Sequence, residues 1–426
     1  MQLYSEILKK RPYIDRTFWV LFFMLIGVAA LALFSATSDL VFDEDNKSII
    51  GPLGRQVCFL LAGCVLAYLT QFVPNRLVTA IGYLIFGVSL LLVYSLLWKG
   101  NPLAVSAHGA ARWIRIGVTF QPAELAKLGL LIVVADLLTK GQIEEEKHKY
   151  FLWTIGLTVA TCFPIMVSNM STAVLLAGIV FLMWILARVP WKKILIVAAI
   201  AVSTGIAGYL FGEFIYVRPG RKASGLMERI TVWCKRVDDF AEEKKQPRGT
   251  EVKLNDTNRQ RVLAKVAVMR GRKTPLGVGP GNSQERDYLP LAYEDYIFAI
   301  FVEEYGIIGA VFLIFIYLAI LFRACYASTK FYGDGRAMLT VMGLALMITC
   351  QAFVSMAVSV GLGPVTGQPL PLVSHGGTSA IVTSLYFGIM MGVSREQEEM
   401  RAREHLSAVE SEQDAPEINL SPDPTV

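Results

Sequence analysis

The sequence predicts an all-α integral membrane protein with ten transmembrane helices, both termini in the cytoplasm, and a large external loop between helices 7 and 8. Of its 426 residues, 54% are hydrophobic and only 18% are charged, whereas a typical soluble domain carries about 25% charged residues. The mean hydropathy is +0.49. This composition excludes a disordered, collagen-like or disulfide-stapled secreted chain. A net charge of +5 without a basic tract interleaved with aromatics gives no sign of a nucleic-acid partner.

A helix needs about 20 mostly apolar residues to cross the hydrocarbon core of a bilayer. Ten segments meet this requirement, namely 17–35, 56–73, 78–97, 122–139, 151–167, 171–188, 193–213, 296–322, 337–360 and 377–394. The first is too long for the apolar region of a signal peptide and has no small-residue cleavage site after it, so we expect it to stay attached as an anchor. Residues 17–394 therefore form the membrane domain, and 1–16 precede it as a cytoplasmic tail.

The basic residues of the short loops predict the orientation, because Lys and Arg concentrate on the cytoplasmic side. One side holds Lys9, Lys10, Arg11, Arg16, Arg76, Lys140, Lys147, Lys149, Arg188, Lys192, Lys193, Arg323, Lys330, Arg336, Arg395, Arg401 and Arg403. The short loops of the other side hold only Lys47, Arg55, Lys99, Arg112 and Arg115. Both termini are therefore predicted to be cytoplasmic, and the loop from about 214 to 295 shares the external face with segment 361–376.

The composition changes abruptly after the last span. Segment 395–426 begins with a stretch rich in Glu and Arg and ends in a stretch that contains Pro, Ser and Asp. We expect a short cytoplasmic helix followed by a disordered end.

Metal, redox and hydrolase signatures are absent from the sequence. Five of the six cysteines fall in or beside apolar runs, and Cys234 stands alone in a polar stretch, so we expect neither a disulfide nor a metal-thiolate site. The chain has no His-x-x-x-His, Cys-x-x-Cys, Gly-x-Ser-x-Gly or Walker motif. Any chemistry must therefore come from carboxylates and bases on the external face.

Ionisable residues at membrane depth are functional candidates, because they are costly unless they face a cavity or a partner. Glu124 and Lys127 are three residues apart at the start of a span and can form an ion pair on one helix face. They follow Arg112 and Trp113. The alternative interpretation is purely structural, with one ion pair and an interfacial Trp anchor.

A second group of candidates lies before the eighth span. Gly277, Gly279 and Gly281 alternate with other residues ahead of Asn282 and Ser283. Glycines allow a backbone to approach a ligand closely, and N–H groups in such a turn can hold a phosphate. An ordinary turn is the alternative.

Asp295 begins the eighth span and is flanked by aromatic residues that limit its solvation. It is either a helix N-cap, which Asp favours, or a functional carboxylate. Glu303 and Glu304 lie about two turns inside the same helix, where we expect them to pair with a buried cation or to line a polar cavity.

The segment before the last span is rich in Gly and Pro and carries no charge. It includes Ser374, His375, Gly376 and Gly377. Such a segment is neither a regular helix nor a strand, so at the membrane surface it must be buried in protein or line a wet cavity. A single His of this kind is more often a hydrogen-bonded structural residue than a ligand.

The motifs, taken in order, resemble those of the SEDS family of shape, elongation, division and sporulation proteins over about residues 15–395. The matching segments are Gly109–Ile114, Phe120–Lys127, Asn169–Ala173, Gly277–Ser283, Tyr288–Pro290, Asp295–Phe298, Glu303–Gly306 and Pro364–Gly377. The sequence departs from the family where Asn169 replaces a carboxylate found in many members and His375 replaces a usual Tyr. Arg270 and Arg272 stand where small residues are common.

The resemblance implies a peptidoglycan glycosyltransferase that polymerises lipid II at the outer face of the bacterial cytoplasmic membrane. Its substrates would be lipid II and the glycan linked to undecaprenyl pyrophosphate, and its partners a class B penicillin-binding protein and other divisome membrane proteins. The form of the 277–283 segment and the long tail favour the division branch, at the septum, over an elongation-type polymerase. A lipid II flippase and a non-catalytic divisome scaffold are the rival functions.

The family's essential aspartate corresponds to Asp295, which we interpret as the catalytic base. The leaving pyrophosphate needs positive charge, for which Arg112 and Lys127 are the candidates, with Glu124 orienting Lys127. A divalent cation, magnesium or manganese, is a further candidate that the residues do not identify. The remaining predicted substrate-binding residues are Gly279, Gly281, Asn282, Ser283, Ser374, Gly376 and Gly377.

Overall fold

The computed structural model describes residues 14–37, 50–98, 100–107, 110–143, 146–216, 226–245, 258–285, 295–331 and 334–413. The predicted tails before residue 14 and after residue 413, and segment 286–294 of the predicted external loop, lie outside these residues. The helices are α2 Arg16–Thr37, α3 Ile50–Thr70, α4 Asn75–Ser95, α5 Pro122–Ile143, α6 Lys147–Ser168, α7 Met170–Leu186, α8 Trp191–Tyr216, α9 Leu226–Lys245, α10 Arg259–Gly271, α11 Ile297–Thr329, α12 Gly335–Ser359 and α13 Gly377–Gln413.

Each predicted span falls on a helix. Six helices of the described chain, α4, α6, α8, α11, α12 and α13, are long and apolar enough to cross a membrane, and shorter apolar stretches lie within α2, α3 and α7. The remaining predicted span falls on α5, which carries Glu124, Lys127, Asp136 and Lys140 and is not among these apolar helices. The chain is therefore a multi-pass membrane protein.

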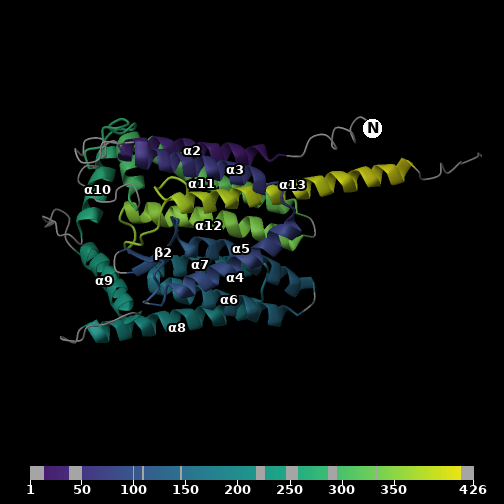
Figure 1. The fold of residues 1–426 in the computed structure, drawn as a ribbon, viewed down its shortest axis with the longest axis horizontal. Helices are drawn as coiled ribbons and strands as arrows, with labels where there is room; N and C mark the ends of the chain where they lie inside the picture. Colours follow the sequence, from purple (N-terminus) through teal and green to yellow (C-terminus); the bar gives the residue numbers. More distant parts are fainter. Residues whose placement is uncertain are drawn as a thin grey trace, which may run out of the picture.

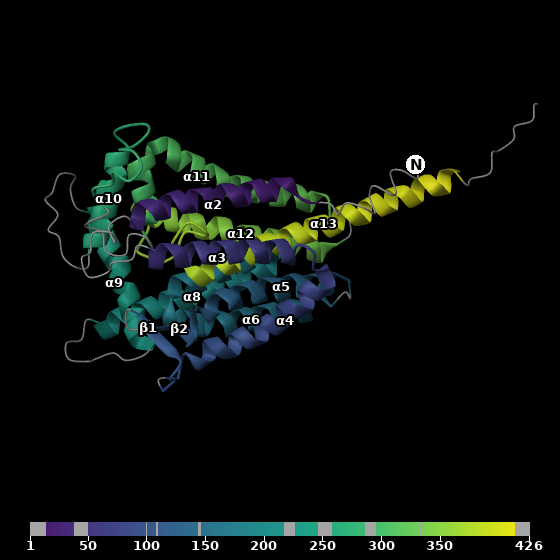
Figure 2. The same cartoon turned by 45° about the horizontal axis from the view of Figure 1, so that its top comes forward.

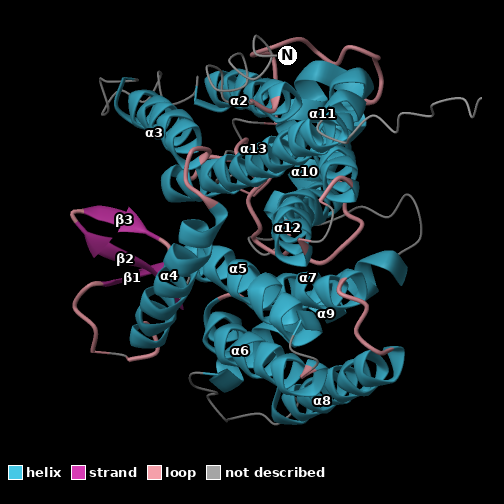
Figure 3. Ribbon diagram, turned by 90° about the vertical axis from the view of Figure 1, so that its right-hand side faces the viewer, coloured by secondary structure: helices cyan, strands magenta, loops and turns pink. Residues whose placement is uncertain are grey.

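Helix α5 lies at the centre of the bundle, between α4, α6 and α12 (Figure 3). Its apolar residues point in all directions and most are buried, as expected for an interior helix. A Cβ at Gly129 would lie 2.7 Å from Cα of Phe86, so the small residue allows α4 and α5 to pack backbone against backbone. The charged side chains of Glu124, Lys127 and Asp136 are thus held inside protein, whereas Lys140, in the last turn of the helix, is exposed.

A small antiparallel sheet of order β1-β2-β3 corrects the all-α prediction. It consists of β1 Ala104–Ala107, β2 Ala110–Ile116 and β3 Val118–Phe120, and Arg115 stands opposite Thr119. Gly117 adopts φ 71° at the reversal between β2 and β3, a conformation that favours glycine. The β-branched and aromatic residues on either side suit strands, but these strands are too short to give a clear alternation in the sequence.

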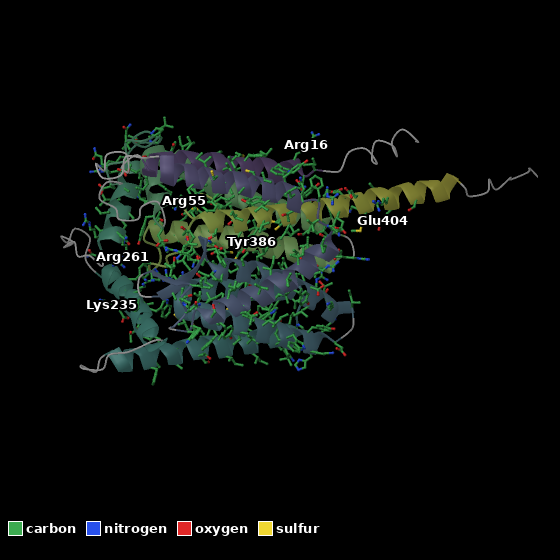
Figure 4. All side chains as sticks on the ribbon, viewed as in Figure 1. Arg16, Arg55, Lys235, Arg261, Tyr386 and Glu404 are labelled. Carbon is green, nitrogen blue, oxygen red and sulfur yellow. The ribbon has the colours of Figure 1, made fainter. Side chains whose placement is uncertain are left out.

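The predicted external loop is partly helical, because it contains α9 and α10. Both helices lie at one end of the bundle, the left end in Figures 1 and 2, and α13 projects from the other end. Figure 4 places Arg55, Lys235 and Arg261 at the α9 and α10 end and Arg16 and Glu404 at the opposite end. The predicted cytoplasmic helix is a direct continuation of α13 as far as Gln413.

A buried polar cluster joins three helices at the end opposite α9 and α10. Asp15 is 1% exposed and accepts hydrogen bonds from the Arg323 guanidinium of α11 and from Ser394 of α13. It also accepts from the backbone N–H of Phe18 in the first turn of α2. These hydrogen bonds to one buried carboxylate hold the ends of α2, α11 and α13 together.

Candidate functional site

A cavity of about 850 Å³ lies at the end of the bundle that carries α9 and α10. Five parts of the chain line it: the start of α3, strands β2 and β3 with the turn between them, the start of α5, the junction of α6 and α7, and the segment 367–379. Asp295, just before α11, completes the wall. The cavity therefore gathers residues far apart in the sequence.

The cavity is rich in cationic side chains. Arg55, Arg112 and Arg115 line it, and the carboxylates among its lining residues are Glu124 and Asp295. Nε of Arg112 donates to the backbone carbonyl of Ser168 at 2.9 Å, which fixes its guanidinium at the junction of α6 and α7. Arginine forks bind phosphate oxygens in pairs, so this wall is suited to a pyrophosphate.

Five of the predicted site residues meet at this cavity: Arg112, Glu124, Asp295, Gly376 and Gly377. The other predicted residues do not line it. Sequence reasoning did not select Arg55 or Arg115 as site residues, and they entered only as minor charges of the external side. Their position next to apolar spans marks both arginines as candidates in the sequence. The sequence does not reveal that they line the same cavity.

Glu124 and Lys127 form the predicted ion pair, which is confirmed. Their atoms Oε1 and Nζ are 2.8 Å apart, and the side chains are 8% and 1% exposed. Lys127 also donates to Oε1 of Gln351 at 3.2 Å, and Nε2 of Gln351 donates to the carbonyl of Pro369 at 3.0 Å. Lys127 therefore lies behind the wall and links Glu124 to the cavity-lining segment through α12.

The segment before α13 is irregular and packed into protein, as predicted. Ser374 is buried and its Oγ accepts from the backbone N–H of Leu370 at 2.8 Å. The hydroxyl of Tyr317 donates to the carbonyl of Pro371 at 2.7 Å. A Cβ at Gly377 would collide with the ring of Phe59, so glycine allows α13 to begin against α3. The first N–H groups of a helix attract anions, and here they open onto the cavity.

Asp295 is partly buried and lies at the cavity wall. The helix begins at Ile297 with Tyr296 at the N-cap position, so Asp295 does not occupy the place that the N-cap alternative required. A Cβ at Gly367 would lie 3.6 Å from Oδ2 of Asp295, and its absence leaves space beside the carboxylate.

The glycine-rich segment lies against α11 and outside the cavity lining. The backbone N–H of Gly279 donates to the carbonyl of Glu304 at 3.0 Å, and Oγ of Ser283 donates to Oε2 of Glu303 at 2.5 Å. Gly281 and Asn282 are exposed. Substrate binding by Gly279, Gly281, Asn282 and Ser283 stays a prediction.

The two buried glutamates of α11 find partners. Oε1 of Glu303 lies 3.7 Å from NH1 of Arg270, whose side chain is 36% exposed, so Glu303 does pair with a cation, but not with the buried cation that was expected. Oε1 of Glu304 accepts from the hydroxyl of Ser35 in α2. Both glutamates act in the packing of α11.

His375 gives the cavity a pH-dependent element. Burial, together with the nearby Arg55 charge, lowers the pKa of His375 below its ordinary value. The unfolded chain, with a His pKa of about 6.5, then binds more protons than the folded chain as the pH falls below that value. The stability that depends on neutral His375 is therefore fully present above about pH 6.5. It declines as the pH falls toward the folded pKa, by at most about 1.4 kcal/mol per pH unit.

We expect the melting temperature of the wild type to fall more steeply between pH 7.5 and pH 5.5, on either side of about 6.5, than that of His375→Gln. Thermal unfolding in detergent across this range measures the difference. Parallel curves for the two proteins would contradict the assignment.

Residues 15–399 match the family of cell cycle proteins represented by FtsW, RodA and SpoVE. Among curated relatives, the probable peptidoglycan glycosyltransferase FtsW of Halomonas elongata is 28% identical over 83% of this chain and 84% of its own. Its counterpart in Nitrosomonas europaea is also 28% identical, over 88% of this chain and 90% of its own.

Two solved structures share the fold. A chain from a peptidoglycan synthase complex, studied for how it coordinates polymerization and crosslinking, has a TM-score of 0.67, 23% identity, and coverage of 90% of this chain and 98% of its own. The rod shape determining protein RodA of Thermus thermophilus has a TM-score of 0.59, 24% identity, and coverage of 90% and 97%.

Proposed function

The chain belongs to the FtsW, RodA and SpoVE family of cell cycle proteins, and we propose that it is a peptidoglycan glycosyltransferase that polymerises lipid II through the cavity at Asp295. The observation that carries this proposal is the convergence of one carboxylate before α11 with Arg55, Arg112 and Arg115 on a single cavity. Glycosyl transfer from a lipid pyrophosphate needs a base for the acceptor and positive charge for the leaving group.

In the proposed reaction, a sugar hydroxyl of one lipid-linked disaccharide attacks the anomeric carbon of the glycan carried on the other lipid. The new bond joins the hydroxyl oxygen to the anomeric carbon, and the bond from that carbon to the pyrophosphate oxygen breaks. Asp295 takes the hydroxyl proton, which contributes about 10²–10⁴-fold. Arg112, with Arg55 and Arg115, stabilises the charge on the departing pyrophosphate.

Glu124 lies in the wall of this site, and Lys127 supports it from behind. Their ion pair and the hydrogen bonds through Gln351 connect the start of α5 to Pro369 in the cavity wall. Lys127 therefore acts on the site indirectly, by orienting Glu124 and, through Gln351, the cavity wall. Ser374 holds the segment that places Gly376 and Gly377 at the cavity.

A divalent cation fits this site only together with substrate. No group of three or more His, Cys, Asp or Glu side chains among the described residues could hold a metal by itself. Magnesium is commonly held by one or two carboxylates plus substrate phosphates, and Asp295 and Glu124 are the carboxylates of the wall. When bound, such an ion would add positive charge beside the pyrophosphate.

The proposed topology has ten spans, cytoplasmic termini, and the cavity on the outer face. It is supported by the excess of Lys and Arg in alternate loops, and by the position of α9 and α10 at the end opposite to Arg16 and Glu404. The lipid tails of both substrates would remain in the bilayer while their sugars enter the cavity.

Reporter fusions test this topology. A reporter fused after Arg395 and another fused after Lys149 should both report the cytoplasm, and one inserted near Lys244 should report the outside. An external signal from the Arg395 fusion would contradict the ten-span arrangement.

We further propose that the protein works with a class B penicillin-binding protein and other divisome proteins at the septum. The FtsW names of the relatives favour the division role over elongation. The structural neighbour from a complex that coordinates polymerization with crosslinking supports a transpeptidase partner. A flippase would need polar groups through both halves of the membrane, whereas this cavity occupies one end of the bundle.

Purified protein incubated with lipid II, with and without its transpeptidase partner, tests the proposed function. Polymerase activity predicts glycan strands that lengthen with time. Lipid II that crosses liposome bilayers without being polymerised would identify a flippase, and neither activity would identify a scaffold.

A further inference from the structure

Helix α11 is broken at Gly306, which adopts φ 66° and ψ −162° inside an otherwise continuous helical run. The break separates a short half-helix, residues 297–305, from the longer part of the span. Asp295 lies two residues before this half-helix. Its position therefore depends on how firmly the half-helix is held.

The segment after α10 supplies the hydrogen bonds that the break removes. The carbonyls of Glu303 and Glu304 accept from the backbone N–H groups of Val278 and Gly279 at 2.9 and 3.0 Å. The N–H of Ile308 donates to the carbonyl of Pro275 at 3.2 Å. Unpaired backbone groups at membrane depth are costly, so this exchange joins the two segments along a seam.

Glycines allow the seam to close. A Cβ at Gly277 would lie 2.5 Å from the carbonyl oxygens of Glu303 and Glu304, and one at Gly306 would overlap the carbonyl of Pro275. A Cβ at Gly271 would overlap the carbonyl of Val302. The two backbones are therefore in direct contact from the end of α10 to the break.

Glu303 locks the seam with its side chain, which is fully buried. Its carboxylate accepts from Oγ of Ser283 at 2.5 Å and from the N–H of Gln284 at 3.3 Å, with Arg270 at 3.7 Å. Arg270 is itself fixed by Oε1 of Glu285 at 3.0 Å. One buried carboxylate thus joins the half-helix to the end of α10 and to the loop that follows it.

We propose that Glu303 is a positioning residue for Asp295. The proposal rests on the proposed function of Asp295, but it concerns a different group. The half-helix rises by about 9 Å between Ile297 and Glu303, at about 1.5 Å per residue, and Asp295 lies two residues before Ile297. Glu303 is not among the residues that line the cavity. It acts by holding the half-helix, with Arg270, Ser283 and the Gly306 break, so that the base meets the acceptor hydroxyl.

Kinetics of the Glu303→Gln variant test this role. Misplacement of a reacting group by about 1 Å can cost about 10²-fold, so we expect turnover to fall by about 10-fold to 10²-fold while KM for lipid II stays near the wild-type value. Glu398→Gln, which removes a carboxylate from an ion pair on α13, should leave turnover unchanged. A raised KM with normal turnover would overturn the proposal in favour of substrate contact.

Ser283→Ala provides a milder variant if Glu303→Gln fails to fold, because it removes the hydrogen bond to Glu303 and no charge. Like Glu303→Gln, it should lower turnover without raising KM, but by a smaller factor. Gly306→Ala should disrupt the seam, whereas Gly205→Ala in α8, where a Cβ meets nothing within 4 Å, should be neutral.

A measurement that does not depend on activity tests the role of Glu303 separately from the role of Asp295 as the base. In a background without native cysteines, a charged thiol reagent labels Asp295→Cys, and Thr119→Cys, which also lines the cavity, serves as the control. Adding Glu303→Gln should change the labelling rate at position 295 several-fold and leave position 119 unchanged. Unchanged labelling at position 295 would overturn the proposal even if Asp295 is the base, and an active Asp295→Asn would refute the base without touching this result.

Discussion

The Asp295→Asn variant is expected to lose glycan synthesis by about 10²-fold or more while its melting temperature stays close to that of the wild type. Asparagine preserves the shape of the side chain and removes the proton acceptor. Glycan synthesis from lipid II by the purified variant, measured beside its thermal unfolding, gives both values.

The same pair of measurements distinguishes catalysis from capping. Asn caps a helix nearly as well as Asp, and even Ala costs only about 0.5–2 kcal/mol at such a site. The N-cap position here belongs to Tyr296, so the loss of a helix cap is not a reason to expect lower stability. Near-normal synthesis would refute the catalytic role, and a loss of synthesis matched by a large loss of stability would return Asp295 to a structural role. In cells, a folded but inactive variant should block division by occupying the machinery.

The Lys127→Met variant is expected to lose about 3–5 kcal/mol of stability, because it leaves the Glu124 carboxylate buried without its cation. Glycan synthesis should fall with it, since the connection from α5 through Gln351 to the cavity wall is broken. Adding Glu124→Gln removes the buried charge and should recover much of the melting temperature but not the activity.

Two control variants are compared with Lys127→Met. Lys330→Met removes one partner of a half-exposed ion pair, with side chains 30% and 23% exposed, and should cost at most about 1 kcal/mol. Arg112→Gln alters the cavity wall and should weaken the use of lipid II with little change in stability. A Lys127→Met variant as stable as Lys330→Met would contradict the structural account of the buried pair.

The helical bundle could be predicted from the sequence because a membrane span requires a long apolar run, and every such run falls on a helix. The pairing of Glu124 with Lys127 was predictable for a similar reason, since residues three apart share a helix face. In both cases the information is local. The short strands around Arg112 escaped prediction because they offer too few residues for a reliable pattern.

The composition of the site could be predicted only in part. Arg55 and His375 are separated by most of the chain and meet through the packing of α3 against α13, which no local pattern reports. The break at Gly306 lies inside an apolar run that reads as one span, and only a backbone dihedral reveals it. For the same reason, the glycines at 277–281 read as a ligand loop, whereas Gly277 and Gly279 lie along a seam with α11.

Chemical rescue of the Asp295→Ala variant tests most directly whether this side chain takes the proton. The truncation leaves space at the wall of a cavity of about 850 Å³, in which formate can act as an external base. If Asp295 is the base, we expect Asp295→Ala to be inactive alone and formate to restore measurable glycan synthesis in proportion to its ionised fraction, whereas the wild type should not respond. Synthesis by Asp295→Ala at the wild-type rate without formate would contradict this role.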